Sequence, residues 1–165
     1  MHKLAAGLSS LFLFIACNLP TNSSNNNSGG TGPVVKMTIN DGTGAFSVNG
    51  TTSVTALTGG QVQVDVGAIE LNAPGRQMHI QIWCNASDVG VPLAINQLTA
   101  PISGTAVYGK TATAMEPFAA GAGTTGSVTF DNLTLGDNTL TGSFSFTAIN
   151  KSGGTVSITS GTFGK

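Results

Sequence analysis

The chain has few of the side chains on which catalysis and metal binding usually depend. Its 165 residues include two histidines, two cysteines, one tryptophan and one tyrosine, and only 8% of them are charged. One histidine is His2, so His79 is the sole histidine in the rest of the chain. This scarcity excludes a multi-histidine metal site and an H-E-x-x-H motif, and the chain has no G-x-S-x-G nucleophile motif. We therefore expect no metal and no cofactor.

An excess of positive charge is also lacking. Six Lys and Arg residues against seven Asp and Glu residues give a formal net charge of −1, and no basic run occurs. Nucleic acids and anionic lipid headgroups are bound by clustered positive charge, so neither is expected as a partner.

The first 16 residues have the composition of a signal peptide. His2 and Lys3 provide a weakly positive start, and residues 4–16 carry no charge. This apolar run is shorter than the roughly 20 residues that a membrane-spanning helix needs, but it suits a signal-peptide core. For ordinary secretory cleavage after Ala16, Phe14 occupies a position where a small residue is preferred.

The segment FIAC, which ends at Cys17, resembles the lipobox of bacterial lipoproteins, where the cysteine becomes the acylated first residue. The resemblance implies acyl chains on Cys17, and Asn18 after it implies sorting to the outer membrane. A stable anchor needs more than one such chain. We therefore expect residues 1–16 to be a lipoprotein signal peptide and the chain to be anchored in the outer membrane. A secreted protein with an unusual cleavage site is the alternative.

Residues 18–33 are mostly Asn, Ser, Thr and Gly, a composition that buries too little apolar surface to fold. We predict that residues 17–33 are the lipidated cysteine and a disordered tether. The remaining residues, 34–165, are about 130 in number and suffice for a single domain. Once Cys17 is acylated, Cys84 has no cysteine left with which to form a disulfide.

Short alternating stretches separated by turn residues predict that this domain is all-β. Asn49-Gly50, within AFSVNGTTSV, is typical of a two-residue hairpin turn. Pro74-Gly75, Gly136-Asp137-Asn138 and the loop closing on Gly153 predict three further turns. Successive hairpins of this kind favour an antiparallel meander of about eight to ten strands, either a sandwich or a closed barrel.

The apolar pattern of two hairpins predicts a β-bulge in each. Val66 and Ile69 lie in opposite phases, so an extra residue near Gly67 is needed to bring both to the core. A second bulge near Asn132 aligns the apolar residues of a later hairpin. Cys84 is expected to pack as a small apolar residue. The predicted pairs are Val64 with Cys84, Val66 with Ile82, Ile69 with Ile80, Phe130 with Phe144 and Val128 with Phe146.

The stretch LTGSFSFTAINKSGGTVSITSGTF, residues 140–163, resembles the end of a family of small bacterial envelope lipoproteins of unknown function. Domains of that family end in a G-x-F-x-F-T-A strand, a Gly-rich turn and a V-x-I-T-x-G-x-F strand. GSVTFDNL and AFSVNG, earlier in the chain, are similar to the same pattern. The resemblance implies an all-β fold on a lipid anchor and supplies no catalytic residues.

The outward positions of residues 77–85 form the candidate binding site, because alternate side chains of a strand share one face. With a bulge near Gly67, two carboxylates of the preceding strand join that face. Sugars are typically held by an aromatic ring and planar polar groups, so this strip is a hypothesis for glycan binding. The alternative is that its residues only form cross-strand pairs that support the sheet. The candidate residues are Trp83, His79, Gln81, Glu70 and Asp65, with Glu70 expected opposite His79 and Asp65 opposite Trp83.

These observations predict a non-enzymatic, lipid-anchored envelope domain that binds a glycan or an envelope protein or has a structural role. The alternative is a hydrolase or lyase that uses Asp65, Glu70 and His79 for acid–base chemistry. The two hypotheses differ in space, since catalysis requires these three groups to converge.

Overall fold

The structure, a computed structural model, describes residues 34–40, 44–72, 75–95, 103–111, 118–120, 123–134 and 140–164. The predicted signal peptide, Cys17 and the tether lie outside these residues. No helix within the described ranges has the length and apolar character needed to cross a bilayer. The strands are β1 (Val34–Ile39), β2 (Gly44–Ala56), β3 (Gln61–Ile69), β4 (Gln77–Asn85), β5 (Leu93–Ala94), β6 (Ser103–Gly109), β7 (Phe118–Ala120), β8 (Gly126–Asn132), β9 (Thr141–Ile149) and β10 (Thr155–Gly164), and the 3-10 turn η1 (Thr58–Gly60) follows β2.

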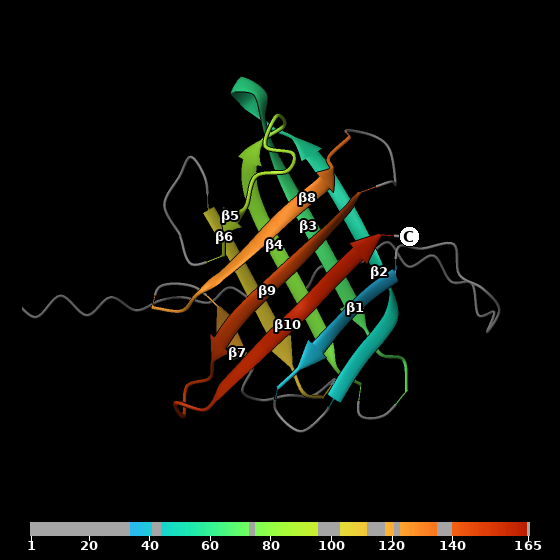
Figure 1. The fold of residues 1–165 in the computed structure, drawn as a ribbon, viewed down its shortest axis with the longest axis vertical. Coiled ribbons are helices and arrows are strands. Elements are labelled where there is room, and N and C mark those ends of the chain that lie inside the picture. Colours follow the sequence, from blue (N-terminus) through green and yellow to red (C-terminus); the bar gives the residue numbers. More distant parts are fainter. Residues whose placement is uncertain are drawn as a thin grey trace, which may run out of the picture.

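Eight strands close into an antiparallel barrel, in the order β1-β2-β3-β4-β6-β7-β9-β10, with β10 returning to β1 (Figure 1). β7 and β8 pair with different parts of the same edge of β9, and β5 pairs with β8. Of the two architectures that the hairpin pattern allowed, the chain adopts the barrel. Closure matters physically, because it removes the unpaired edge strands through which an open sheet aggregates.

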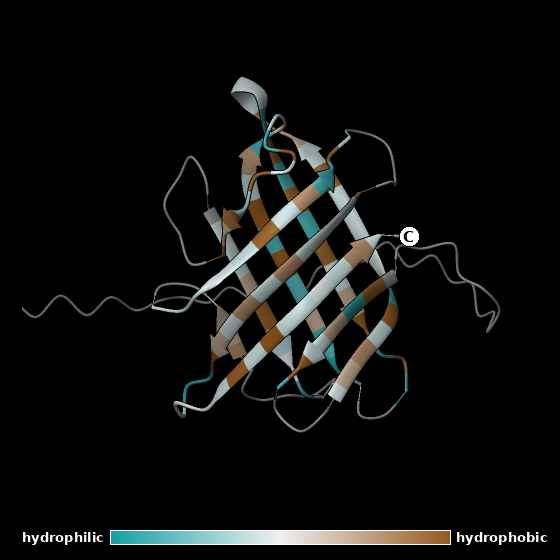
Figure 2. Ribbon diagram, viewed as in Figure 1, coloured by the Kyte–Doolittle hydropathy of each residue, from teal (hydrophilic) through white to brown (hydrophobic). Residues whose placement is uncertain are grey.

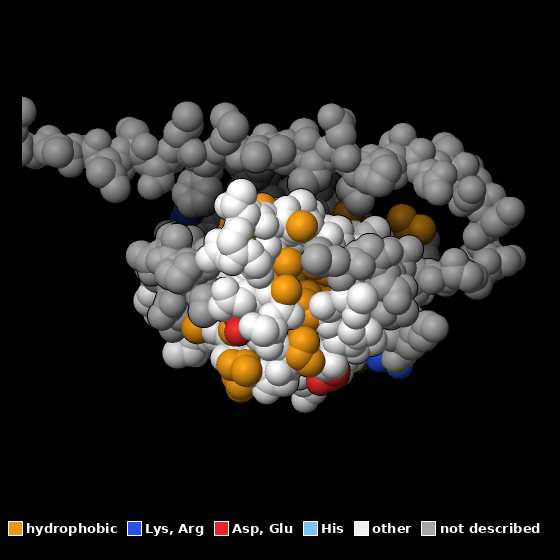
Figure 3. Space-filling view, turned by 90° about the horizontal axis from the view of Figure 1, so that it is seen from above, with side chains coloured by type: hydrophobic (Ala, Val, Ile, Leu, Met, Phe, Trp, Pro, Cys, Tyr) orange, Lys and Arg blue, Asp and Glu red, His pale blue; other side chains and the backbone are white. Residues whose placement is uncertain are grey.

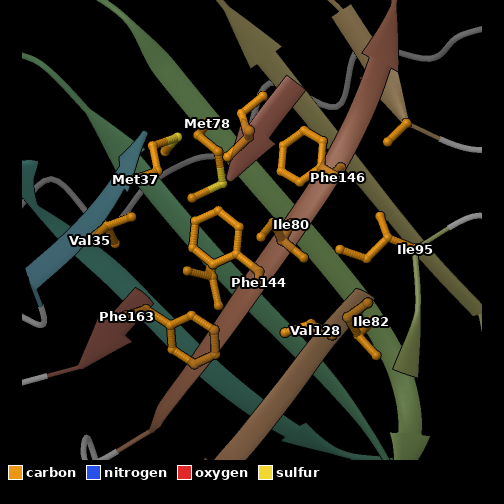
Figure 4. Packing of buried hydrophobic residues seen from close by; sticks show 14 of the residues in the cluster. Val35, Met37, Met78, Ile80, Ile82, Ile95, Val128, Phe144, Phe146 and Phe163 are labelled. Carbon is orange, nitrogen blue, oxygen red and sulfur yellow. The ribbon is translucent and has the colours of Figure 1, made fainter. Parts of the chain in front are cut away.

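Strict alternation of side chains fills the barrel with apolar residues. In β4, for example, Met78, Ile80, Ile82 and Cys84 are all buried, whereas the residues between them are not. Figure 4 shows inward side chains from several strands, including β1, β4, β9 and β10, turned toward one another. The interior of an eight-stranded barrel is just wide enough to be filled by side chains. A ligand-binding surface on the described residues is therefore to be sought on the outer wall or the ends.

One end of the barrel carries η1 beside the loop between β4 and β5. The two are joined by the N–H of Ala86, which donates to the carbonyl of Gly60 at 3.1 Å. Leu57, Val89 and Val91 are each 40% exposed or more. Figure 3 looks onto this end and shows apolar side chains among backbone and other side-chain atoms, with few acidic groups in the described part. This end is thus poor in charge, like the chain as a whole.

The predicted hairpin turn at Asn49-Gly50 is wrong, because β2 runs without a break from Gly44 to Ala56. Its first half pairs with β1 and its second half with β3, and Gly50 marks the change of partner. A Cβ at Gly50 would lie 2.4 Å from the carbonyl oxygen of Gly67 and 2.6 Å from a methyl group of Val35. The glycine therefore serves a close approach inside a strand, a role that competes with turn formation as the reason for an Asn-Gly pair.

The predicted bulge near Gly67 is also wrong. β3 and β4 pair in one uninterrupted register, in which Val62 faces Cys84, Val64 faces Ile82 and Val66 faces Ile80. Ala68 fills the next inward position, so Ile69 is 42% exposed. The inward face of β3 is complete without Ile69, and nothing forces the strand to change phase. Cys84 is nevertheless buried among apolar side chains, as predicted.

The bulge near Asn132 is confirmed, since the β8–β9 register shifts between Phe130 and Asn132. The predicted pairs are displaced by two residues, so that Val128 faces Phe144 and Phe130 faces Gly142. A Cβ at Gly142 would lie 2.6 Å from the ring of Phe163, which packs on Phe130 with centroids 5.9 Å apart. The ring of Phe163 thus occupies the space that the glycine leaves.

The hairpin between β9 and β10 forms as predicted. The N–H of Asn150 donates to the carbonyl of Gly154 at 2.9 Å, and Gly153 has a φ of 80°. A three-residue loop that closes on a left-handed residue needs glycine there.

Candidate functional site

Five polar or aromatic side chains of β4 lie on the outer wall of the barrel. The alternate residues of this strand are buried in the core, so the remaining ones must face outward. In Figure 2, hydrophilic and hydrophobic bands alternate along β3 and β4. The predicted outward phase is therefore present, and it comprises Gln77, His79, Gln81, Trp83 and Asn85.

Asp65 is the centre of a hydrogen-bonded cluster on this wall. Gln63 Nε2 donates to Asp65 Oδ2 at 2.9 Å, and Gln81 Nε2 donates to Asp65 Oδ1 at 2.9 Å. His79 Nε2 lies 3.2 Å from the same Oδ1 atom. In the ladder Asp65 faces Gln81 and Trp83 faces Gln63, which corrects the predicted pairing of Asp65 with Trp83. The correction follows from the missing bulge.

The cluster keeps Asp65 ionised. Burial alone would raise the pKa of this carboxyl, but hydrogen bonds from His79, Gln63 and Gln81 outweigh burial and hold the pKa below its ordinary value. Its side chain is about a quarter exposed, and that of His79 about a half. Asp65 is thus a permanent acceptor at neutral pH, with both oxygens engaged.

Glu70 does not join this cluster. It follows the end of β3, where its carboxylate accepts hydrogen bonds from the backbone N–H of Arg76 at 3.1 Å and from Arg76 Nε at 2.9 Å, and it contacts Nη2 as well. His79 faces Gly67 in the ladder instead, so the predicted pairing of Glu70 with His79 is wrong. Hydrogen bonds from Arg76 lower the pKa of Glu70, despite an opposing effect of burial. The three groups proposed for catalysis therefore divide into two separate sites.

The residues that the sequence analysis missed are Gln63 and Arg76. The place of Gln63 beside Asp65 can be predicted from the sequence, because in QVQVD it precedes Asp65 by two residues and shares its face. Arg76 lies six residues after Glu70, across the Pro-Gly turn, which is a spacing that a tight hairpin brings together. Gln63, Asp65, His79, Gln81 and Trp83 are called the β3–β4 face below.

The remaining titratable groups offer little chemistry. Cys84 is fully buried, and burial raises its pKa to about 11, so its thiolate is scarce at neutral pH. No group of three or more His, Cys, Asp or Glu residues that could hold a metal ion occurs in the part of the chain that the structure describes.

Comparison with family models, curated protein sequences and solved structures finds no match to this chain.

Proposed function

We propose that the protein is a non-enzymatic binding domain of the bacterial cell envelope, lipid-anchored at the outer membrane through Cys17. It binds a glycan on the outer wall of its barrel, at the β3–β4 face. The observation that carries this proposal is the cluster around Asp65, where one carboxylate holds two amides and an imidazole in place on the same wall as Trp83.

Such a face has the groups that sugar recognition uses. An indole ring offers an apolar platform, while amides and an imidazole offer donors and acceptors at fixed positions. Trp83 is only partly buried, so part of its ring is open to a ligand. Because these polar groups are already fixed before binding, less side-chain entropy is lost when a ligand binds.

The hydrolase or lyase alternative is less well supported. Acid–base cleavage of a glycosidic bond needs one carboxyl group with a raised pKa, which can give up a proton. The pKa values of Asp65 and Glu70 are both lowered, and Glu70 is engaged by Arg76. Neither group is poised to donate.

The anchor is supported by the sequence. The FIAC segment and the polar stretch after Cys17 match a lipidated cysteine on a tether, and the resemblance of residues 140–163 to envelope lipoproteins agrees with it. A chain with two or more acyl groups stays bound to a membrane. The barrel would then present its wall to glycans within reach of the tether.

A glycan array probed with the full chain tests this function. We expect retention on a subset of glycans by the wild type and its loss in Trp83→Ala, whereas the matched outward change Thr129→Ala on β8 keeps it. Equal retention by wild type and Trp83→Ala would rule out a role for this face in glycan binding. An envelope protein that both chains capture, with no glycan retained, would favour protein binding instead. Mass spectrometry of the mature chain tests the anchor, and an unmodified Cys17 would refute it.

A further inference from the structure

An apolar row continues the β3–β4 face across the barrel wall. Val107 on β6 is the ladder partner of His79, Ala119 on β7 is the partner of Val107, and Ile149 on β9 is the partner of Ala119. All three side chains point outward, and Val107 and Ile149 are 37% and 41% exposed. β6, β7 and β9 are consecutive in the barrel (Figure 1), so the row is continuous.

Asp65 determines which atoms the polar half of the face presents. An ionised carboxylate only accepts hydrogen bonds, so Gln63 and Gln81 must turn their amide nitrogens toward it. Each amide then keeps its oxygen and one N–H for a ligand. His79 approaches Asp65 through Nε2, so Nδ1 is the ring nitrogen left to hydrogen-bond a ligand.

His79 and Val107 together match one chemical group. Directly opposite residues in a ladder have Cβ atoms about 5 Å apart, so a hydrogen-bonding ring nitrogen and an apolar side chain lie next to each other here. An acetamido substituent carries an amide N–H, a carbonyl oxygen and a methyl group close together, so it can hydrogen-bond the imidazole and contact the apolar side chain at once. A simple hydroxyl would leave Val107 without a partner, and a methyl group alone would leave His79 without one.

The face is longer than one sugar ring. Trp83 lies four residues from His79 along β4, or roughly 13 Å. A ligand that contacts both must therefore be an oligosaccharide. The eight side chains of the face and the row include no Lys or Arg, so nothing in them favours an anionic ligand.

We propose that the β3–β4 face and the row formed by Val107, Ala119 and Ile149 together bind an N-acetylated oligosaccharide. One pyranose ring stacks on Trp83, and an acetamido group of another forms a hydrogen bond with His79 while its methyl group contacts Val107. This proposal rests on the proposed glycan-binding function and specifies its ligand class.

Titration of the full chain with two tetrasaccharides, followed by NMR or calorimetry, tests the proposal. Chitotetraose carries acetamido groups, and cellotetraose has the same linkage without them. We expect chitotetraose to bind about tenfold more tightly, since one methyl-sized apolar contact and one satisfied polar group discriminate by at least that factor. Val107→Thr keeps the shape and strand preference of the residue, and it should remove most of the difference. Val91→Thr, the same change at a more exposed valine at the end of the barrel, should remove none.

Equal affinity for the two tetrasaccharides would overturn the assignment of N-acetylated ligands and leave glycan binding intact. The proposal would also be overturned if Val107→Thr weakened both ligands equally, or if neither tetrasaccharide bound. In the last case, the glycan array decides separately whether the proposed function survives. Circular dichroism of both variants distinguishes a lost contact from a lost fold.

Discussion

The guanidinium group of Arg76 lies over the ring of Phe46, 5.3 Å from its centroid. Its Nη2 also donates to the carbonyl of Ala45 at 3.3 Å, and the same side chain pairs with Glu70. Arg76 is 8% exposed, which makes it the single buried charged residue among those that the structure describes. It therefore joins β2 to the turn between β3 and β4, next to the wall that carries the candidate site.

Replacing Arg76 by Met should destabilise the barrel strongly. The change leaves Glu70 partly buried without its cation and removes the contact with Phe46, so we expect a loss of about 2–3 kcal/mol in the free energy of unfolding. Urea denaturation monitored by circular dichroism measures it. The control is Lys151→Met in an exposed turn, for which a change within about 0.5 kcal/mol is expected. Similar losses in the two variants would contradict this role for Arg76.

Gly142 and Gly67 should respond differently to substitution by Ala. A Cβ at Gly142 would lie 2.3 Å from the carbonyl oxygen of Thr129, which is backbone and cannot move away cheaply. At Gly67 the nearest atom is Thr51 Oγ1 at 3.1 Å, at the end of a side chain that can rotate. We expect Gly142→Ala to cost about 2 kcal/mol or more and Gly67→Ala less than about 0.5 kcal/mol. Thermal unfolding of both variants is the measurement, and a reversed order would refute the β8–β9 register.

Stability should fall in acid partly through Asp65. Its pKa is lower in the folded chain than in the unfolded one, so its contribution is fully present above the unfolded value, about 4, and is lost as pH falls through the folded value. We expect wild type and Asp65→Asn to converge in stability as the pH is lowered from 7 to 2. The difference in stability between wild type and Glu70→Gln should also shrink as the pH falls, because the pKa of Glu70 is also lowered. If wild type remained more stable than Asp65→Asn at pH 2, the ionised carboxylate would not be the source of the difference in stability.

The two cysteines should differ in their reaction with a thiol reagent. Cys84 is fully buried with a pKa of about 11, so Ellman's reagent should not modify it in the native chain at pH 8. In denaturant one thiol per chain should react, since Cys17 is expected to be acylated. A thiol that reacts rapidly in the native state would instead indicate an unmodified Cys17.

Much of the barrel could be predicted from alternation alone. Side chains of β4 point inward and outward as its sequence indicates, and so do the valines of β3. The loop ending at Gly153 could also be predicted, because a left-handed residue is required there and glycine adopts that conformation readily. Local rules of this kind hold when one residue decides the geometry.

Register was harder to predict, because it depends on contacts far apart in the sequence. The change of phase predicted before Ile69 does not occur, because Ala68 completes the inward face of β3. The β8–β9 pairing depends on Phe163 filling the space beside Gly142, which lies on a different strand. Without the predicted bulge, Asp65 lies on the predicted wall but faces Gln81 rather than Trp83. Asn49-Gly50 failed for the same reason, since Val35 and Gly67 determine its role.

The pairing of β1 with β10 has a consequence for the order in which the chain folds. Val34 faces Gly164 in that ladder, so the ring cannot shut until the last strand has been made. A chain without β10 would expose open edges and an unfinished interior, and contacts this distant in sequence form slowly. The topology itself therefore delays closure of the barrel until β10 has been made.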